Sequence, residues 1–208
     1  MQRTLVRDVG EHVGEVVTVQ GFAQTVRDQK RVQFIVLRDH TGMVQVVIER
    51  SEEYARFNEL VANLARESAV QVTGLVVADP HIRLGGLEIR LQDLQVVSLA
   101  DPVLPIDLSE RTTTMIDKRL DWRFLDLRRP ESLAIFQVQT TAEHAMREFW
   151  LSEGFIEIHT PKLMGVPSES GAELFELAYF GETAYLAQSP QFYKQMAMAA
   201  GFDRVFEI

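Results

Sequence analysis

Residues 31–49 read RVQFIVLRDHTGMVQVVIE, and this stretch decides the fold of the N-terminal half of the chain. Apolar and polar side chains alternate along its two arms, as they do in half-buried strands. The three residues between the arms, His40-Thr41-Gly42, suit a short hairpin turn that contains a glycine. The stretch therefore predicts two β-strands joined by a tight turn.

The flanking sequence extends this hairpin into a five-stranded pattern. Residues 14–26 precede it as a further strand, and residues 52–66 follow it with apolar side chains at helical spacing. Two more strands are expected at 69–79 and 87–98, joined by a loop that contains Pro80, Gly85 and Gly86. Five strands with one intervening helix are typical of an OB barrel, whose sheet face commonly binds single-stranded nucleic acid. The spacing alone fits a generic small barrel equally well.

The C-terminal half has a different pattern, in which helices dominate. Residues 101–130 indicate a hinge with a short helix around 117–126, and Pro130 begins a long helix that ends near Ser152. Gly154 suits a left-handed C-terminal cap, and residues 155–158 form a strand that Thr160-Pro161 ends. We therefore expect an α+β chain with a barrel at 1–100, a hinge at 101–130 and a second domain at 131–208.

Composition excludes several classes of protein. The chain has 208 residues, of which 46% are hydrophobic, so it is long enough to bury a core. It contains no Cys, which excludes disulfides and thiolate metal sites, and no metal site is predicted elsewhere. No apolar run suits a signal peptide or a membrane span, so we expect a cytoplasmic protein without a membrane partner. The net charge of −9 argues against a general nucleic-acid binder, and no DNA partner is expected.

A basic strip lies within the acidic second half. It consists of Arg111, Lys118, Arg119, Arg123, Arg128 and Arg129. Such a strip suits contacts with phosphate groups at one place. However, Asp117, Asp121 and Asp126 alternate with these cations, so pairing within the protein explains the pattern equally well.

Two groups of residues could bind ligands. Phe34 could stack on a base and Gln45, eleven residues later on the adjoining strand, could bond its edge, which suits an unpaired nucleotide of RNA. In QSPQFYKQ, residues 188–195, Ser189 is a good helix N-cap and Pro190 suits the first helical position. Gln191 and Lys194 then share one helical face. A core Phe and a solvated polar helix face are the simpler interpretations of the two groups.

Four segments in order resemble aspartyl-tRNA synthetases, class II ligases that charge tRNA, and most closely their archaeal and eukaryotic-type members. These segments are FIVLRDHTGMVQVVIE (34–49), RFLDLRRPE (123–131), GFIEIHTPKL (154–163) and QSPQFYKQ (188–195). The resemblance implies an N-terminal OB-fold anticodon-binding domain followed by the beginning of a class II catalytic domain, an antiparallel sheet with helices.

The resemblance also implies roles for individual residues. Phe34 and Gln45 match the residues that recognise the middle anticodon base, and Glu88 and Arg27 match further anticodon-contacting residues. The L-aspartate site would consist of Glu169, Gln188, Ser189, Gln191, Phe192, Tyr193 and Lys194. The helix–strand–proline unit that ends at Pro161 matches the motif that forms the dimer interface in class II synthetases, so a homodimer is expected.

Lys194 bears on the choice of substrate. A half-buried ammonium group forms a charge-assisted bond with a carboxylate but gains less from a neutral amide. The similar asparaginyl-tRNA synthetases carry an acidic residue at this position. Lys194 therefore indicates aspartate as the amino acid.

The implied reaction uses ATP and Mg²⁺ to form aspartyl-adenylate and then transfers the aspartyl group to tRNA-Asp, and in some members also to tRNA-Asn. The chain ends at Arg204-Val205-Phe206-Glu207-Ile208, before the ATP-binding Arg-x-Glu of motif 2 and before motif 3. We therefore expect no catalytic residue within it and no adenylate formation by residues 1–208 alone. An RNA-binding protein that has lost catalysis is the alternative, and a free amino-acid enzyme or sensor fits the barrel less well.

Overall fold

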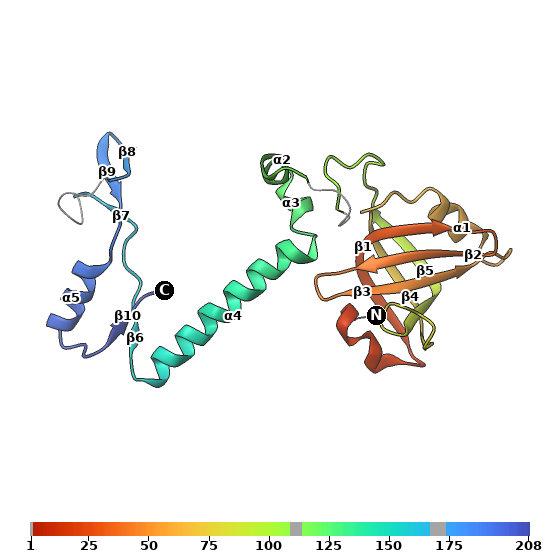
Figure 1. Cartoon of the computed structure of the whole chain (residues 1–208), viewed down its shortest axis with the longest axis horizontal. Helices are drawn as coiled ribbons and strands as arrows, with labels where there is room; N and C mark the ends of the chain where they lie inside the picture. The colour runs from red at the N-terminus through yellow and green to blue at the C-terminus, as the bar shows by residue number, and fades with distance from the viewer. Residues whose placement is uncertain (1, 109–113, 167–173) are drawn as a thin grey trace. The chain divides into compact units, whose positions relative to one another are not determined.

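The structure is a computed structural model, and it describes residues 2–108, 114–166 and 174–208 (Figure 1). The chain divides into two compact units, Met1–Arg129 and Pro130–Ile208. The first unit contains a closed five-stranded barrel, and the second contains one two-stranded and one three-stranded sheet.

The barrel has the strands and the helix expected from the sequence. Its elements are η1 (Val6–His12), β1 (Val16–Asp28), β2 (Val32–Arg38), β3 (Met43–Glu49), α1 (Ala55–Ala62), β4 (Ala69–Ala78) and β5 (Leu87–Ser98). The strands close in the order β1-β2-β3-β5-β4 (Figure 1). Strands β3 and β5 pair in parallel, and the other neighbours pair antiparallel. This is the predicted OB barrel.

The alternation in residues 32–49 divides the hairpin into a core face and an outer face. The side chains of Ile35 and Leu37 on β2 are fully buried. The side chains of Val46 and Ile48 on β3 are fully buried as well. Gln33 also lies on the core side, where Asn58 Nδ2 donates to its Oε1 and its own Nε2 donates to the Asn58 carbonyl oxygen, both at 3.0 Å. Because the buried amide is paired, it does not disrupt the apolar core.

Gly21 allows β1 and β2 to approach closely. A Cβ atom at this position would lie 2.3 Å from the carbonyl oxygen of Arg38, which no real contact tolerates. The register between the two strands then shifts between Ala23 and Thr25, so that a bulge bends β1 around the barrel.

Asp39 fastens the N-terminal segment to the turn between β2 and β3. Its Oδ1 accepts bonds from the backbone N–H of Thr41 at 2.7 Å and of Gly42 at 3.1 Å, and its Oδ2 accepts from the Val6 N–H at 3.0 Å. Burial by itself raises the pKa of Asp39, but the bonds from Thr41, Val6 and Gly42 outweigh it and hold the pKa below its usual value.

The segment that follows β5 packs within the first unit. The structure has two short helices here, α2 (Ile116–Asp121) and α3 (Arg123–Asp126), where the sequence predicted one. They break at Trp122, whose backbone leaves helical geometry at φ −112° and ψ 42°. A small apolar cluster joins Leu125 of α3 to Ile106 and Leu108. The hinge predicted at 101–130 stays a prediction.

The second unit begins with the long helix that the sequence predicts. Its elements are α4 (Pro130–Ser152), β6 (Ile156–Glu157), β7 (Leu163–Met164), β8 (Glu176–Tyr179), β9 (Glu182–Leu186), α5 (Gln191–Ala199) and β10 (Val205–Phe206). Strands β7, β9 and β8 form an antiparallel sheet in that order, whereas β6 and β10 pair in parallel. Gly154 has φ +79°, as expected for a left-handed cap after α4.

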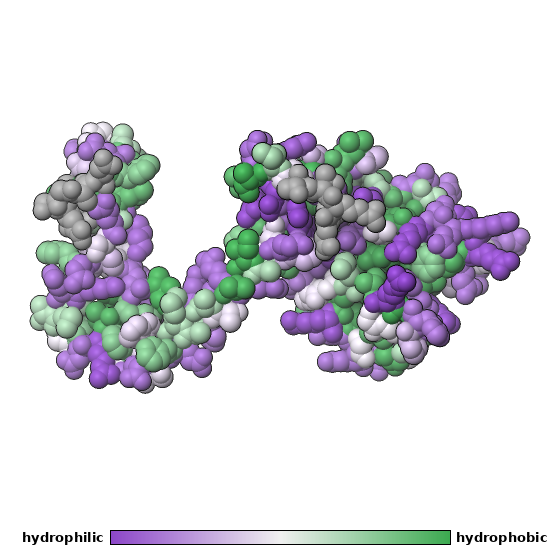
Figure 2. Space-filling view, in the orientation of Figure 1, coloured by the Kyte–Doolittle hydropathy of each residue, from purple (hydrophilic) through white to green (hydrophobic). Residues whose placement is uncertain are grey.

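Few apolar side chains of the second unit are buried. Among its described residues, the buried apolar side chains are those of Ala184 and Phe206. On α4, Ile135 is 60% exposed and Val138 is 69% exposed, so these two side chains do not belong to a core of the unit. Figure 2 shows apolar side chains at the surface over α4 and α5.

Candidate nucleic-acid interface and ligand-binding residues

The outer face of the barrel carries Phe34 and Gln45. Phe34 lies between the buried Gln33 and Ile35 on β2, so its side chain is on the opposite face from the core, where it is half-buried. Phe34 pairs with Val47 of β3, and Gln45 lies two residues before Val47 on the same face. The two side chains are therefore diagonal neighbours across adjoining strands, within reach of one ligand.

Arg27 and Glu88 extend this face to both sides. Arg27 of β1 pairs directly with Phe34, and Glu88 of β5 pairs directly with Gln45. The Gln45 Nε2 group lies 3.5 Å from Glu88 Oε2, at the limit of a hydrogen bond. The four residues therefore form one patch across β1, β2, β3 and β5, which we call the outer-face cluster. It combines a cation, an aromatic ring, an amide and a carboxylate.

A polar hollow of about 550 Å³ adjoins the outer-face cluster, and sequence reasoning missed it. It shares Glu88 with the cluster and has Tyr54 in its wall. Its remaining lining is Arg31, Val32, Val47, Glu49, Arg50, Glu53, Arg90 and Leu91. Arg90 Nε lies 3.4 Å from Glu88 Oε1. The alternation of β5 could have indicated Arg90, because residues two apart on a strand share a face.

Arg50 is held at the rim of this hollow by Asp28. Its Nη2 group bonds Asp28 Oδ1, and its Nε donates to the carbonyl oxygen of Gln29 at 3.0 Å. The Arg50 guanidinium beside Asp28 lowers the pKa of that carboxyl group. Arg50 is therefore less available to a ligand than Arg31.

Three cations of the basic strip are paired within the protein. Arg119 Nε and Arg123 Nη1 each lie 2.6 Å from an oxygen of Asp126, whose side chain is fully buried. Arg128 Nη1 donates to Glu67 Oε2 at 3.0 Å. Internal pairing, one of the two interpretations of the strip, therefore holds for these three residues. Arg111 lies outside the described residues.

The start of α5 groups part of the predicted amino-acid site. The helix begins at Gln191 with Pro190 as its N-cap, one residue later than predicted. Ser189 therefore lies before the cap, where its Oγ accepts a bond from the Gln191 N–H at 3.3 Å. The Ser189 side chain still satisfies one of the first free N–H groups of the helix, so the one-residue difference in the helix start does not change its capping role.

Lys194 follows Gln191 by three residues and lies on the same side of the helix. Its side chain is half-buried, and it forms no ion pair with any carboxylate of the described residues. Gln191 is exposed, Phe192 is 62% exposed, and Tyr193 is half-buried with its ring 6.3 Å from that of Phe192. Gln188 precedes this group and is exposed. The predicted partner Glu169 lies outside the described residues.

Glu207 fixes the segment around Pro161, and sequence reasoning did not identify it. One of its carboxylate oxygens accepts a bond from the Thr160 N–H at 2.9 Å and lies 2.5 Å from Lys162 Nζ. Burial alone would raise the pKa of Glu207, but Lys162 and Thr160 lower it to about 2. Pro161 itself is exposed. No local signal marks Glu207, because its partners lie more than forty residues earlier in the chain.

The described residues contain no group of three or more His, Cys, Asp or Glu side chains that could hold a metal ion. Within the same residues, none of the helices has the length and apolar character needed to cross a membrane. The candidate sites are thus the outer-face cluster and the start of α5.

Both halves of the chain match known families. Residues 13–97 match the OB-fold nucleic acid binding domain, and residues 115–208 match the class II tRNA synthetases (D, K and N). The chain is 43% identical over 198 residues to the aspartate–tRNA(Asp/Asn) ligase of Archaeoglobus fulgidus, covering 95% of this chain and 46% of that protein. It is 45% identical over 195 residues to the aspartate–tRNA(Asp) ligase of Pyrococcus horikoshii, covering 94% of this chain and 44% of that protein. The chain thus spans about half the length of these relatives.

Solved structures agree with this likeness. The asparaginyl-tRNA synthetase of Pyrococcus horikoshii complexed with asparaginyl-adenylate has a TM-score of 0.87 at 33% identity, covering 100% of this chain and 47% of that one. The aspartyl-tRNA synthetase of Entamoeba histolytica has a TM-score of 0.81 at 29% identity, covering 100% of this chain and 45% of that one.

Proposed function

Because residues 115–208 belong to the class II tRNA synthetases (D, K and N) and residues 13–97 to the OB-fold nucleic acid binding domains, we propose that this chain acts in aspartate–tRNA ligation. In this proposal the outer-face cluster binds the anticodon of tRNA-Asp, and the start of α5 binds L-aspartate. The relatives named for both tRNA(Asp) and tRNA(Asp/Asn) leave tRNA-Asn as a second RNA substrate.

One observation carries the assignment to aspartate: the ammonium group of Lys194 at the start of α5. It is half-buried and has no carboxylate partner among the described residues. An ammonium group in this position gains a charge-assisted bond from the side-chain carboxylate of aspartate, whereas the amide of asparagine offers no opposite charge. The N-terminal end of the helix adds a partial positive charge, which also favours an anionic ligand.

The outer-face cluster supports recognition of an unpaired base. Phe34 offers a ring face for stacking, and the amide of Gln45 can both donate to and accept from a base edge. Arg27, which pairs with Phe34 across the strands, is exposed and can contact a phosphate group. A single nucleotide can thus be held by its base and its backbone on one face.

Ligation by this class of enzyme uses ATP and Mg²⁺. The described residues hold no group of three or more His, Cys, Asp or Glu side chains that could hold a metal ion, and no step through the metal is assigned to them. We propose that the chain positions aspartate and RNA, and that residues 1–208 alone do not form the adenylate.

A second candidate is RNA binding without ligation. The barrel buries a continuous apolar core, whereas the described residues of the second unit bury few apolar side chains. Residues 1–129 therefore suit an independent RNA-binding domain. Binding of tRNA-Asp without any binding of aspartate would favour this candidate.

The proposal is tested by calorimetric titration of the chain with L-aspartate and L-asparagine. The expected result is a preference for aspartate that Lys194→Glu removes or reverses. Lys118→Glu is the matched control, because it makes the same charge change on an exposed residue outside the site. An unchanged preference in Lys194→Glu would refute the assigned role of Lys194.

A further inference from the structure

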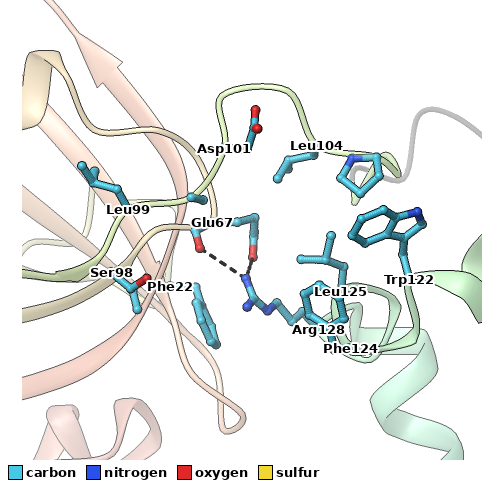
Figure 3. A pocket seen from close by; sticks show the side chains of 13 residues that line it. Phe22, Glu67, Ser98, Leu99, Asp101, Leu104, Trp122, Phe124, Leu125 and Arg128 are labelled. Carbon is cyan, nitrogen blue, oxygen red and sulfur yellow. Dashed lines mark hydrogen bonds and ion pairs between the residues drawn. The ribbon is translucent and has the colours of Figure 1, made fainter.

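A cavity of about 320 Å³ lies within the first unit, away from the outer-face cluster (Figure 3). Its wall is mainly apolar and includes three aromatic rings, those of Phe22, Trp122 and Phe124. The remaining lining is Glu67, Ala69, Ser98, Leu99, Ala100, Asp101, Leu104, Pro105, Leu125 and Arg128. Pockets near this volume with a few placed polar groups are typical of small-molecule and cofactor sites.

Glu67 is unusual in three respects. It is a non-glycine residue at φ +66°, its side chain is fully buried, and its Oε1 has no hydrogen-bond partner among the described residues. Its Oε2 is occupied by Arg38 at 2.7 Å and by Arg128 at 3.0 Å. A buried, unpaired oxygen on a strained backbone is costly to the fold, and such features gather where a ligand is bound.

Arg128 supplies donors that face the same cavity. Its Nη1 group makes both bonds to Glu67, one to Oε2 and one to the carbonyl oxygen at 3.2 Å, so these bonds leave the Nε–H and Nη2 donors unused. The guanidinium lies 3.6 Å from the centroid of the Phe22 ring, which holds its plane in place. Figure 3 shows Arg128 between Glu67 and Leu125.

The charges around the cavity balance. Arg38 and Arg128 offset Glu67 and Asp101, so neither an anion nor a cation is favoured overall. The walls instead favour a flat apolar body, and the unused donors of Arg128 favour a molecule with hydrogen-bond acceptors on its edge. We propose that this cavity binds a purine or pyrimidine base, either as a free nucleoside or as an unpaired base of RNA.

This site is separate from the anticodon face proposed above, and its chemistry does not depend on aspartate binding. A base stacked against Trp122 would place a ring acceptor toward Arg128. Trp122 is 40% exposed in the structure, so a ligand in the cavity changes its surroundings.

Trp122 provides the readout for the test. The chain has two tryptophans, and Trp150→Phe leaves Trp122 as the only tryptophan, whose fluorescence is then followed. This variant is titrated with adenosine, guanosine, cytidine and uridine, and with ribose 5-phosphate as the ligand that lacks a base. We expect saturable quenching by at least one nucleoside and none by ribose 5-phosphate.

Three substitutions test whether the base binds in the cavity rather than elsewhere on the protein. Ala100→Leu fills the cavity and keeps the bonds of Glu67 and Arg128, and we expect it to weaken binding about tenfold or more. Ala62→Leu adds the same volume at an exposed position of α1, away from the cavity, and is the matched control. Phe34→Ala removes the ring of the outer-face cluster and is expected to leave the quenching unchanged.

Each outcome decides for or against the proposal. Quenching by a nucleoside that Ala100→Leu weakens and Ala62→Leu keeps supports it and assigns the site to a free ligand. Quenching of this pattern by a single-stranded oligoribonucleotide but by no nucleoside supports it and assigns the base to RNA. Quenching by neither, equal quenching by ribose 5-phosphate, or loss of quenching in Phe34→Ala overturns it, and in each of these cases the anticodon proposal is untouched.

Discussion

Replacing Arg128 with Ala tests whether the ion cluster at Glu67 stabilises the first unit. The substitution removes both bonds from Nη1 to Glu67 and the contact with the Phe22 ring. A hydrogen bond to a charged group contributes about 1.5–3 kcal/mol and a cation–π contact about 0.5–2 kcal/mol. Because Arg38 still pairs with Glu67 at 2.7 Å, the buried carboxylate keeps one partner. We therefore expect a loss of about 2–3 kcal/mol, below that of a fully broken buried pair.

The assay is urea unfolding followed by Trp122 fluorescence in the Trp150→Phe background, so that the signal reports the first unit. Arg56→Ala is the matched control, because Arg56 also contacts a carboxylate at 3.0 Å and a ring at 4.3 Å. The two arginines differ in exposure, since the side chain of Arg56 is 73% exposed and that of Arg128 is 20% exposed. The control is expected to lose less than about 1 kcal/mol. Equal losses in the two variants would refute the reasoning, since burial would then have no effect.

Three further outcomes are expected. Phe34→Ala should weaken tRNA binding by about 1–3 kcal/mol in a filter-binding assay, whereas Phe180→Ala, at a 92% exposed position of the second unit, should not, and equal effects would count against stacking on the barrel. Because the pKa of Asp39 is lowered in the folded state, its contribution to stability is complete above the unfolded pKa of 3.8 and is lost as the pH falls through the folded pKa. Asp39→Asn should therefore make the free energy of unfolding of the first unit depend less on pH in this range. An unchanged pH dependence would contradict this. The pKa of about 2 at Glu207 gives the same sign, so the stability that it contributes to the second unit is lost as the pH falls from 4.5 toward 2. In Glu207→Gln this pH-dependent loss should disappear, as followed by Trp150 fluorescence in a Trp122→Phe background. A loss of the same size in Glu207→Gln would show that the contacts with Thr160 and Lys162 do not stabilise the unit.

The sequence predicts the barrel well because its signals are local. In the structure the alternation along residues 31–49 places Ile35 and Val46 inside and Phe34 and Gln45 outside, whereas the sequence alone left open whether Phe34 is a core residue. The same alternation places Gln33 in the core, where only its pairing with Asn58, twenty-five residues later, makes it acceptable. Local pattern therefore fixes the face of a residue, whereas the partner that satisfies a buried polar group comes from elsewhere in the chain.

The cavity beside Glu67 could not be predicted for this reason. Its central pair joins Glu67 to Arg128 across sixty-one residues, and neither position carries a distinctive local pattern. The sequence grouped Arg128 with the basic strip because its neighbours are cations. Its actual partner, Glu67, lies two residues before β4 and at least fifty residues earlier in the chain than the Asp residues of the strip.

The pairing of the strip changes where RNA contacts are expected. Arg119 and Arg123 are bound to the fully buried Asp126, so a phosphate group would have to compete with this carboxylate for them. Arg27 and Arg31 are exposed on or beside the outer face and have no such competitor among the described residues. With a net charge of −9, a protein that relied on diffuse attraction would repel RNA. If the chain binds RNA as proposed, we expect the affinity to come from a few phosphate contacts and from base stacking on the barrel. This predicts a shallow salt dependence and a large effect of losing one aromatic ring.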